Sequence, residues 1–157
     1  MSETEKTESG EHATDLKDYK EKILPVNKGR ITLQRDLYFL ATTQRGYEVE
    51  YDVSYQEGCS PTETLLMSVG GCMSIDVVHI LRKMRCEVDH YEMTMEGTRY
   101  PDPPQYYKSV DLTIHISGKR ITPAKLERAI SLSREKYCSV YHSLRKDIEV
   151  NVRYEIE

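Results

Sequence analysis

The pattern of apolar and polar residues divides the chain into a polar start, short alternating stretches and one long apolar run. Residues 1–21 carry almost no apolar side chains and are expected to form a disordered, polar tail. Residues 22–157 are expected to form one folded domain, since the whole chain of 157 residues suits a single core. Apolar and polar residues alternate in stretches over residues 29–55, around a turn at residues 44–46, and this pattern predicts an antiparallel hairpin or meander.

The long apolar run, residues 59–84, predicts a buried helix. Ser60 and Glu63 have the three-residue spacing of a capping box, which typically begins a helix. Apolar residues then occur on every side, so we expect a helix buried in the core rather than laid on a surface. The pair Gly70–Gly71 interrupts it, and two interpretations stay open. The glycines allow another element to pack closely, or they make room for something to approach Cys72.

The remaining pattern predicts two strands, a second helix and a last strand. The alternating stretches are residues 91–99, 108–117 and 148–156, and helical spacing runs from Thr122 to Leu144. The predicted fold class is therefore α+β, with antiparallel-rich sheets, a buried central helix and a second, amphipathic helix. So few elements leave part of the central helix bare. We therefore expect a homodimer whose interface includes the central helices.

Composition narrows the function classes. The net charge of −4 argues against nucleic-acid binding, which requires a basic face. We expect no transmembrane helix and no membrane partner, because no apolar run is expected to reach membrane-spanning length. No leader peptide is visible, so we expect a cytoplasmic protein. None of the four cysteines forms a CxxC pair, so a structural zinc knuckle is not expected. In a reducing compartment such cysteines are either reactive or simply buried.

Two of these cysteines are candidates for chemistry. Cys72 lies on the predicted central helix and Cys138 on the second helix, and both helices must meet the same core. A single buried cysteine is usually inert, but a pair can react. A nucleophilic thiolate needs a nearby positive charge or hydrogen-bond donors, and Arg45 at the hairpin turn is a candidate. Glu63 is either an ordinary capping residue or holds an arginine or a proton near the site.

The residues around both cysteines resemble a known family. The segment SPTETLLMSVGGC, residues 60–72, is followed by SIDVVHIL, and EKYCSV covers residues 135–140. Together they resemble the two cysteine regions of the OsmC/Ohr superfamily, in its OsmC-like branch, over roughly residues 29–157. The resemblance implies an intertwined dimer that uses no cofactor and reduces organic hydroperoxides in defence against oxidative stress.

The resemblance also implies residue roles. Cys72 would attack the peroxide and become a sulfenic acid, and Cys138 would condense with it to a disulfide. A dithiol, such as the lipoyl group of a partner protein, would then reduce that disulfide. Glu63 would orient an arginine beside the thiolate, and Arg45 is the nearest candidate to contact substrate.

Two alternatives remain open. Cys72, His79, Cys138 and His142 could form a zinc site if both helix faces met, although no metal is expected because Cys72 and His79 stand two helical turns apart. The protein could also be a non-catalytic binding or structural member with vestigial cysteines.

Overall fold

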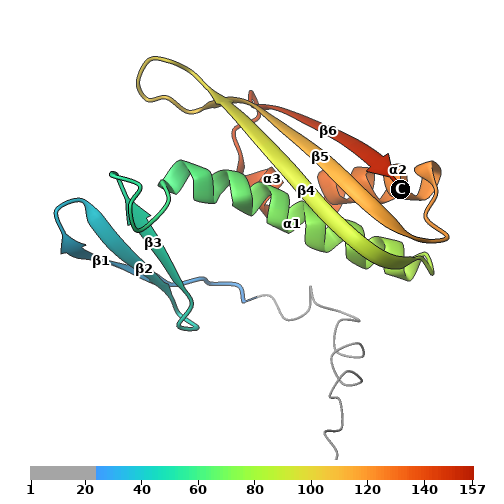
Figure 1. The fold of residues 1–157 in the computed structure, drawn as a ribbon, viewed down its shortest axis with the longest axis horizontal. Helices are drawn as coiled ribbons and strands as arrows, with labels where there is room; N and C mark the ends of the chain where they lie inside the picture. Colours follow the sequence, from blue (N-terminus) through green and yellow to red (C-terminus); the bar gives the residue numbers. More distant parts are fainter. Residues whose placement is uncertain (1–23) are drawn as a thin grey trace, which may run out of the picture. The chain divides into compact units, whose positions relative to one another are not determined.

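A computed structural model describes residues 24–157, so the tail predicted over residues 1–21 lies outside the described residues. The chain divides into two compact units, one ending at Gly58 and one running from Cys59 to Glu157. Figure 1 draws the first in blue to teal and the second in green to red.

The first unit is a three-stranded antiparallel meander. Its strands are β1 (Gly29–Arg35), β2 (Tyr38–Thr43) and β3 (Glu48–Asp52), paired in the order β1-β2-β3. Gly46 takes a φ of +87° in the turn between β2 and β3, a conformation that glycine adopts without steric cost. The meander predicted for this region is confirmed.

Asp52 ends β3 and organises the loop that follows. Its carboxylate accepts hydrogen bonds from the Ser54 amide at 2.9 Å, the Ser54 hydroxyl at 2.7 Å and the Gln56 amide at 3.1 Å. These bonds, those from Ser54 above all, lower the pKa of Asp52 below its ordinary value.

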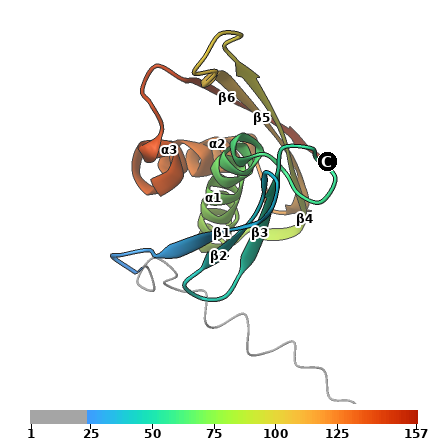
Figure 2. The same ribbon diagram turned by 90° about the vertical axis from the view of Figure 1, so that its left-hand side faces the viewer.

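The second unit packs its helices on a three-stranded sheet. Helix α1 (Pro61–Lys83) is followed by β4 (Glu87–Arg99) and β5 (Tyr107–Lys119), and the chain ends with β6 (Glu149–Ile156). Between β5 and β6 lie α2 (Pro123–Leu132), a π-helical turn (Ser133–Tyr137) and α3 (Ser139–Ser143). In Figure 2 these helices lie on one face of the sheet, and α1 contacts both β4 and α2.

The sheet of the second unit is mixed. Strands β4 and β5 pair antiparallel, whereas β5 and β6 pair in parallel. A parallel neighbour needs a long crossover, and the helical segment between β5 and β6 supplies it. The predicted core face of β5 is confirmed, because Val110, Leu112, Ile114 and Ile116 are all buried.

Helix α1 begins as predicted. The Ser60 hydroxyl accepts a hydrogen bond from the Glu63 amide, and the Glu63 carboxylate accepts one from the Ser60 amide at 2.7 Å. One chain leaves part of the helix bare, as expected from the small number of other elements. Leu65 is 42% exposed and Ile75 57% exposed, so one side of the helix is uncovered here.

The two central glycines have different surroundings. A Cβ on Gly70 would overlap the Met95 side chain of β4, so close packing accounts for this glycine. A Cβ on Gly71 would meet nothing within 4 Å.

The length of α1 corrects a second expectation. By length and composition alone, its 23 residues could cross a membrane, so the statement that no apolar run is long enough is wrong. The core helix of a globular domain passes the same test, and α1 packs on β4 and α2 in that manner.

The second helix is broken where a continuous one was predicted. Helix α2 ends at Leu132, and the Cys138 amide donates to the Ser133 carbonyl at 2.8 Å, which closes a π-helical turn. Cys138 itself is extended, with φ −73° and ψ 97°. Its sulfur accepts the Tyr141 amide at 3.4 Å and so caps the short helix α3. Helical spacing in the sequence did not reveal this break.

Candidate functional site

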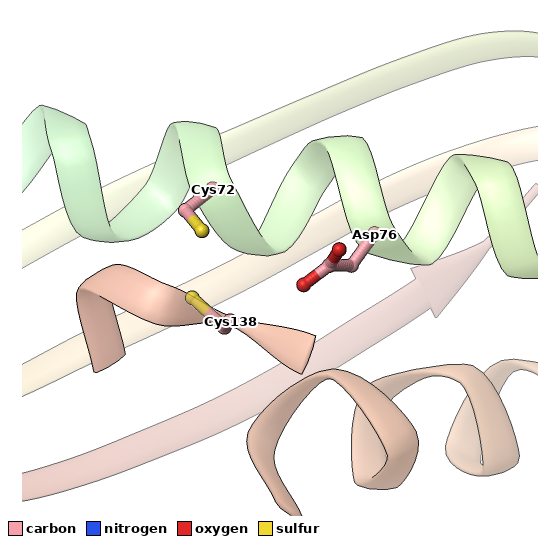
Figure 3. A group of neighbouring side chains, drawn as sticks. All are labelled: Cys72, Asp76 and Cys138. Carbon is pink, nitrogen blue, oxygen red and sulfur yellow. The ribbon is translucent and has the colours of Figure 1, made fainter. Parts of the chain in front are cut away.

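Three side chains from two segments converge in the second unit. The sulfurs of Cys72 and Cys138 and a carboxylate oxygen of Asp76 all lie within 4.8 Å of one another. Figure 3 shows Cys72 and Asp76 one turn apart on α1, both directed toward the segment that carries Cys138. The proximity of the two cysteines is therefore confirmed, while their catalytic roles stay a prediction.

The three groups differ in exposure. Asp76 is 1% exposed and Cys138 is fully buried at 0%, whereas Cys72 is partly exposed. Of the two cysteines, Cys72 is therefore the one that a molecule arriving from solvent would reach first. Cys138 is placed to react only with a group already at Cys72.

Asp76 is held by a hydrogen bond from the second helical segment. The Ser133 hydroxyl donates to Asp76 Oδ2 at 2.9 Å, and Ser133 is also fully buried. Sequence reasoning passed over Asp76. The signal was a lone carboxylate inside an apolar run, four residues after Cys72 and thus on the same helix face.

The environment of Cys138 favours the protonated thiol. Burial above all raises the pKa of Cys138, to about 12, and the neighbouring Cys72 and Asp76 add to the increase. The hydrogen bond from the Tyr141 amide acts in the opposite direction, because it stabilises the thiolate. At neutral pH the Cys138 thiol therefore carries its proton.

The other predicted site residues are Glu63 and Arg45, which belong to different units of the chain. Glu63 bonds back to Ser60 in the capping box, about 13 Å along the helix axis from Cys72. Arg45 belongs to the β2–β3 turn of the first unit. The functional roles of both stay predictions.

The metal donors differ from those considered in the sequence. Over residues 24–157, the donors gathered within 4.8 Å are the two cysteine sulfurs and the Asp76 carboxylate, and neither His79 nor His142 belongs to this group. A ligand set of two cysteines and two histidines is therefore wrong for this structure. A thiophilic ion could be held by the cysteines and Asp76 instead.

Comparison with known proteins identifies the family. A family model described as OsmC-like protein matches residues 54–153. The protein YhfA of Escherichia coli is 34% identical over 130 residues, which cover 82% of this chain and 97% of YhfA. The crystal structure of a hypothetical protein from Aquifex aeolicus matches with a TM-score of 0.77 and 31% identity, over 85% of this chain and 98% of that one.

A more distant structure shares the fold. The organic hydroperoxide resistance protein OhrB of Bacillus subtilis matches with a TM-score of 0.60 at 16% identity, over 85% of this chain and all of OhrB. At that identity the likeness shows the fold alone. The family match over residues 54–153 shows that the chain belongs to the OsmC-like protein family, within the OsmC/Ohr superfamily.

Proposed function

We propose that this protein is a thiol-dependent peroxidase that reduces organic hydroperoxides, with Cys72 as the attacking residue and Cys138 as the resolving residue. The observation that carries the proposal is the pairing of a partly exposed cysteine with a fully buried one, with their sulfurs within 4.8 Å of each other. Such a pair suits a two-step reaction, because the accessible thiol meets the substrate and the buried one meets only the first product.

The proposed reaction uses the two thiols alone and needs no cofactor. The Cys72 sulfur attacks the terminal oxygen of the hydroperoxide, the O–O bond breaks, and the alcohol leaves with the thiol proton. The Cys138 sulfur then displaces water from the Cys72 sulfenic acid, which forms a disulfide. A small dithiol, for which a lipoyl group is the candidate, returns both cysteines to thiols and is itself oxidised to a disulfide.

Two further observations support the reaction class. Some proteins that share the fold are named organic hydroperoxide resistance proteins, from Legionella pneumophila and Bacillus subtilis. Apolar side chains also predominate along α1, among them Met67 and the buried Met73. An apolar surrounding favours an alkyl hydroperoxide over hydrogen peroxide.

The proposal includes a homodimer in a reducing, cytoplasmic setting. The uncovered side of α1, with Leu65, Met67 and Ile75, is the surface that a second copy would cover. In a reducing compartment the two cysteines stay free thiols until peroxide arrives.

Thiol titration before and after one equivalent of cumene hydroperoxide tests the proposal. We expect the loss of two thiols per chain, none in Cys72→Ser, and a dimedone-reactive sulfenic acid without disulfide in Cys138→Ser. Cys59→Ser is the matched control, since Cys59 is partly exposed like Cys72 and should leave the two-thiol loss intact. An unchanged thiol count in the wild type would refute the peroxidase and favour a non-catalytic member of the family. Equal turnover of hydrogen peroxide would contradict the substrate class.

A further inference from the structure

We propose that the reduced protein binds one thiophilic divalent cation, with zinc the best fit, through the sulfurs of Cys72 and Cys138 and the carboxylate of Asp76. This inference goes beyond the proposed peroxidase, and binding would regulate the same two thiols. It rests on the convergence of three donor groups and on the way each is held.

The spacing of the donors fits a tetrahedral ion. Bonds of about 2.3 Å to sulfur and about 2.0–2.2 Å to oxygen place neighbouring ligand atoms about 3.5–3.8 Å apart. The three donor atoms already lie within 4.8 Å of one another without an ion. For one ion to bind all three groups, the donor atoms must approach one another by about 1 Å.

The backbone positions two of the donors as a pair. Cys72 and Asp76 are four residues apart on α1, so both project from one helix face. The same i, i+4 spacing brings two ligands to one ion in helical zinc motifs. The third donor, Cys138, stands in an extended residue fixed from both sides. Its amide donates to the Ser133 carbonyl at 2.8 Å, and its carbonyl accepts the His142 amide at 3.1 Å.

Ser133 supplies the outer contact that ligating carboxylates typically have. Its hydroxyl donates to Asp76 Oδ2 at 2.9 Å, and both residues are buried, so the carboxylate is oriented before any ion arrives. A carboxylate has two oxygens, so this hydrogen bond is compatible with coordination through Oδ1.

The donor set selects the kind of ion. Two thiolates and one carboxylate match the borderline-soft character of zinc, whereas magnesium and calcium prefer oxygen alone. The ion's two positive charges offset negative charges that would otherwise be costly at a buried site. Three protein ligands leave a fourth position for water, and the partial exposure of Cys72 gives solvent access to it.

Metal binding and oxidation exclude each other. Binding of the ion displaces the thiol protons to solvent and holds both sulfurs as thiolates, so neither is free to attack a peroxide. A disulfide between the cysteines removes two of the three ligands. Zinc would therefore protect the reduced pair, and oxidation would release the ion.

Titration of the metal-free, reduced full chain with cobalt(II) and zinc tests the site. We expect one ion per chain, a thiolate-to-cobalt charge-transfer band in the near ultraviolet, and protection of two thiols from a thiol reagent by zinc. Cys72→Ser and Cys138→Ser should lose the band. No charge-transfer band with cobalt, or no protection of thiols by zinc, would overturn the proposal.

The Asp76 variants decide whether the carboxylate takes part. Asp76→Asn should weaken zinc binding at least about tenfold, and Ser133→Ala about 10- to 100-fold. Asp76→Cys supplies a third thiolate and should keep binding while intensifying the band, which keeps the test decisive if Asp76→Asn folds poorly. Asp111→Asn is the matched control, since Asp111 is a partly buried carboxylate outside the site that also accepts a side-chain hydrogen bond, from Asn151 at 3.2 Å. An affinity equal to wild type in Asp76→Asn would exclude Asp76 as a ligand.

These readouts are independent of peroxide turnover. Metal-free protein that consumes no hydroperoxide but binds zinc at these residues would refute the proposed function alone. Turnover without zinc binding would refute the metal site alone.

Discussion

A disulfide between Cys72 and Cys138 would close a long loop of the unfolded chain, so its formation should stabilise the protein measurably. The two cysteines stand 66 positions apart in the sequence. The chain-entropy model gives about 4 kcal/mol for a loop of that length, and measured values usually fall at about 2–4 kcal/mol. Their sulfurs, within 4.8 Å when reduced, must close to about 2.05 Å. The strain of that movement favours the lower part of the range.

Urea unfolding of the reduced and the peroxide-treated protein measures this gain. With a slope of about 2 kcal/mol per M, the midpoint should rise by about 1–2 M after oxidation. Cys138→Ser treated in the same way should show no increase, because its sulfenic acid has no partner. A midpoint that stays constant or falls in the oxidised wild type would refute the reasoning. The sulfurs would then either fail to pair or pair only with a strain that cancels the entropic gain.

Three further predictions follow from the glycines of α1 and from the first unit. Gly70→Ala should lower the free energy of unfolding by about 1–2 kcal/mol, because overpacking against Met95 outweighs the gain in helix propensity. Urea unfolding measures this change, and a stability equal to wild type would contradict the close packing of Gly70 against Met95. Gly71→Leu should leave the circular dichroism spectrum unchanged but convert a dimer to a monomer in sedimentation, and a variant that stays dimeric would remove α1 from the interface. Because the pKa of Asp52 is lowered in the folded state, its bonds should stabilise the loop above about pH 4 and lose that effect as the pH falls through the folded value. Amide exchange at Ser54 and Gln56 measures this loss, which Asp52→Asn should lack.

Local signals in the sequence predicted most of the elements. The capping box at Ser60 and Glu63 is a short-range pattern, and it forms as expected. Alternation along β5 likewise identifies its buried face, because a strand directs successive side chains to opposite sides. The parallel pairing of β5 with β6 depends on the crossover between them, and no residue in either strand encodes it.

The site was only half predictable for a similar reason. Two cysteines on two core-facing helices indicated proximity, but Asp76 lay hidden inside an apolar run. Its partner Ser133 stands 57 positions away in the sequence, so only the folded structure shows that the carboxylate is bonded rather than exposed. The sequence does not reveal the break at Cys138, because apolar residues keep a helical spacing both before and after the π-helical turn.

Ser133 joins the two halves of the site through different atoms, and this makes its proposed functions separable. Its carbonyl accepts the Cys138 amide and so fixes the backbone that presents the resolving sulfur. Its hydroxyl donates to Asp76 and so orients the carboxylate. Ser133→Ala removes only the hydroxyl. We therefore expect this variant to form the Cys72–Cys138 disulfide at close to the wild-type rate while losing zinc affinity. Quenched-flow thiol counting measures the rate of disulfide formation, and chelator competition on the same preparation measures the zinc affinity. An equal loss of disulfide-formation rate and of zinc affinity would mean that the hydroxyl supports the π-helical turn itself. The Cys138 sulfur and the Asp76 carboxylate would then be positioned as one unit.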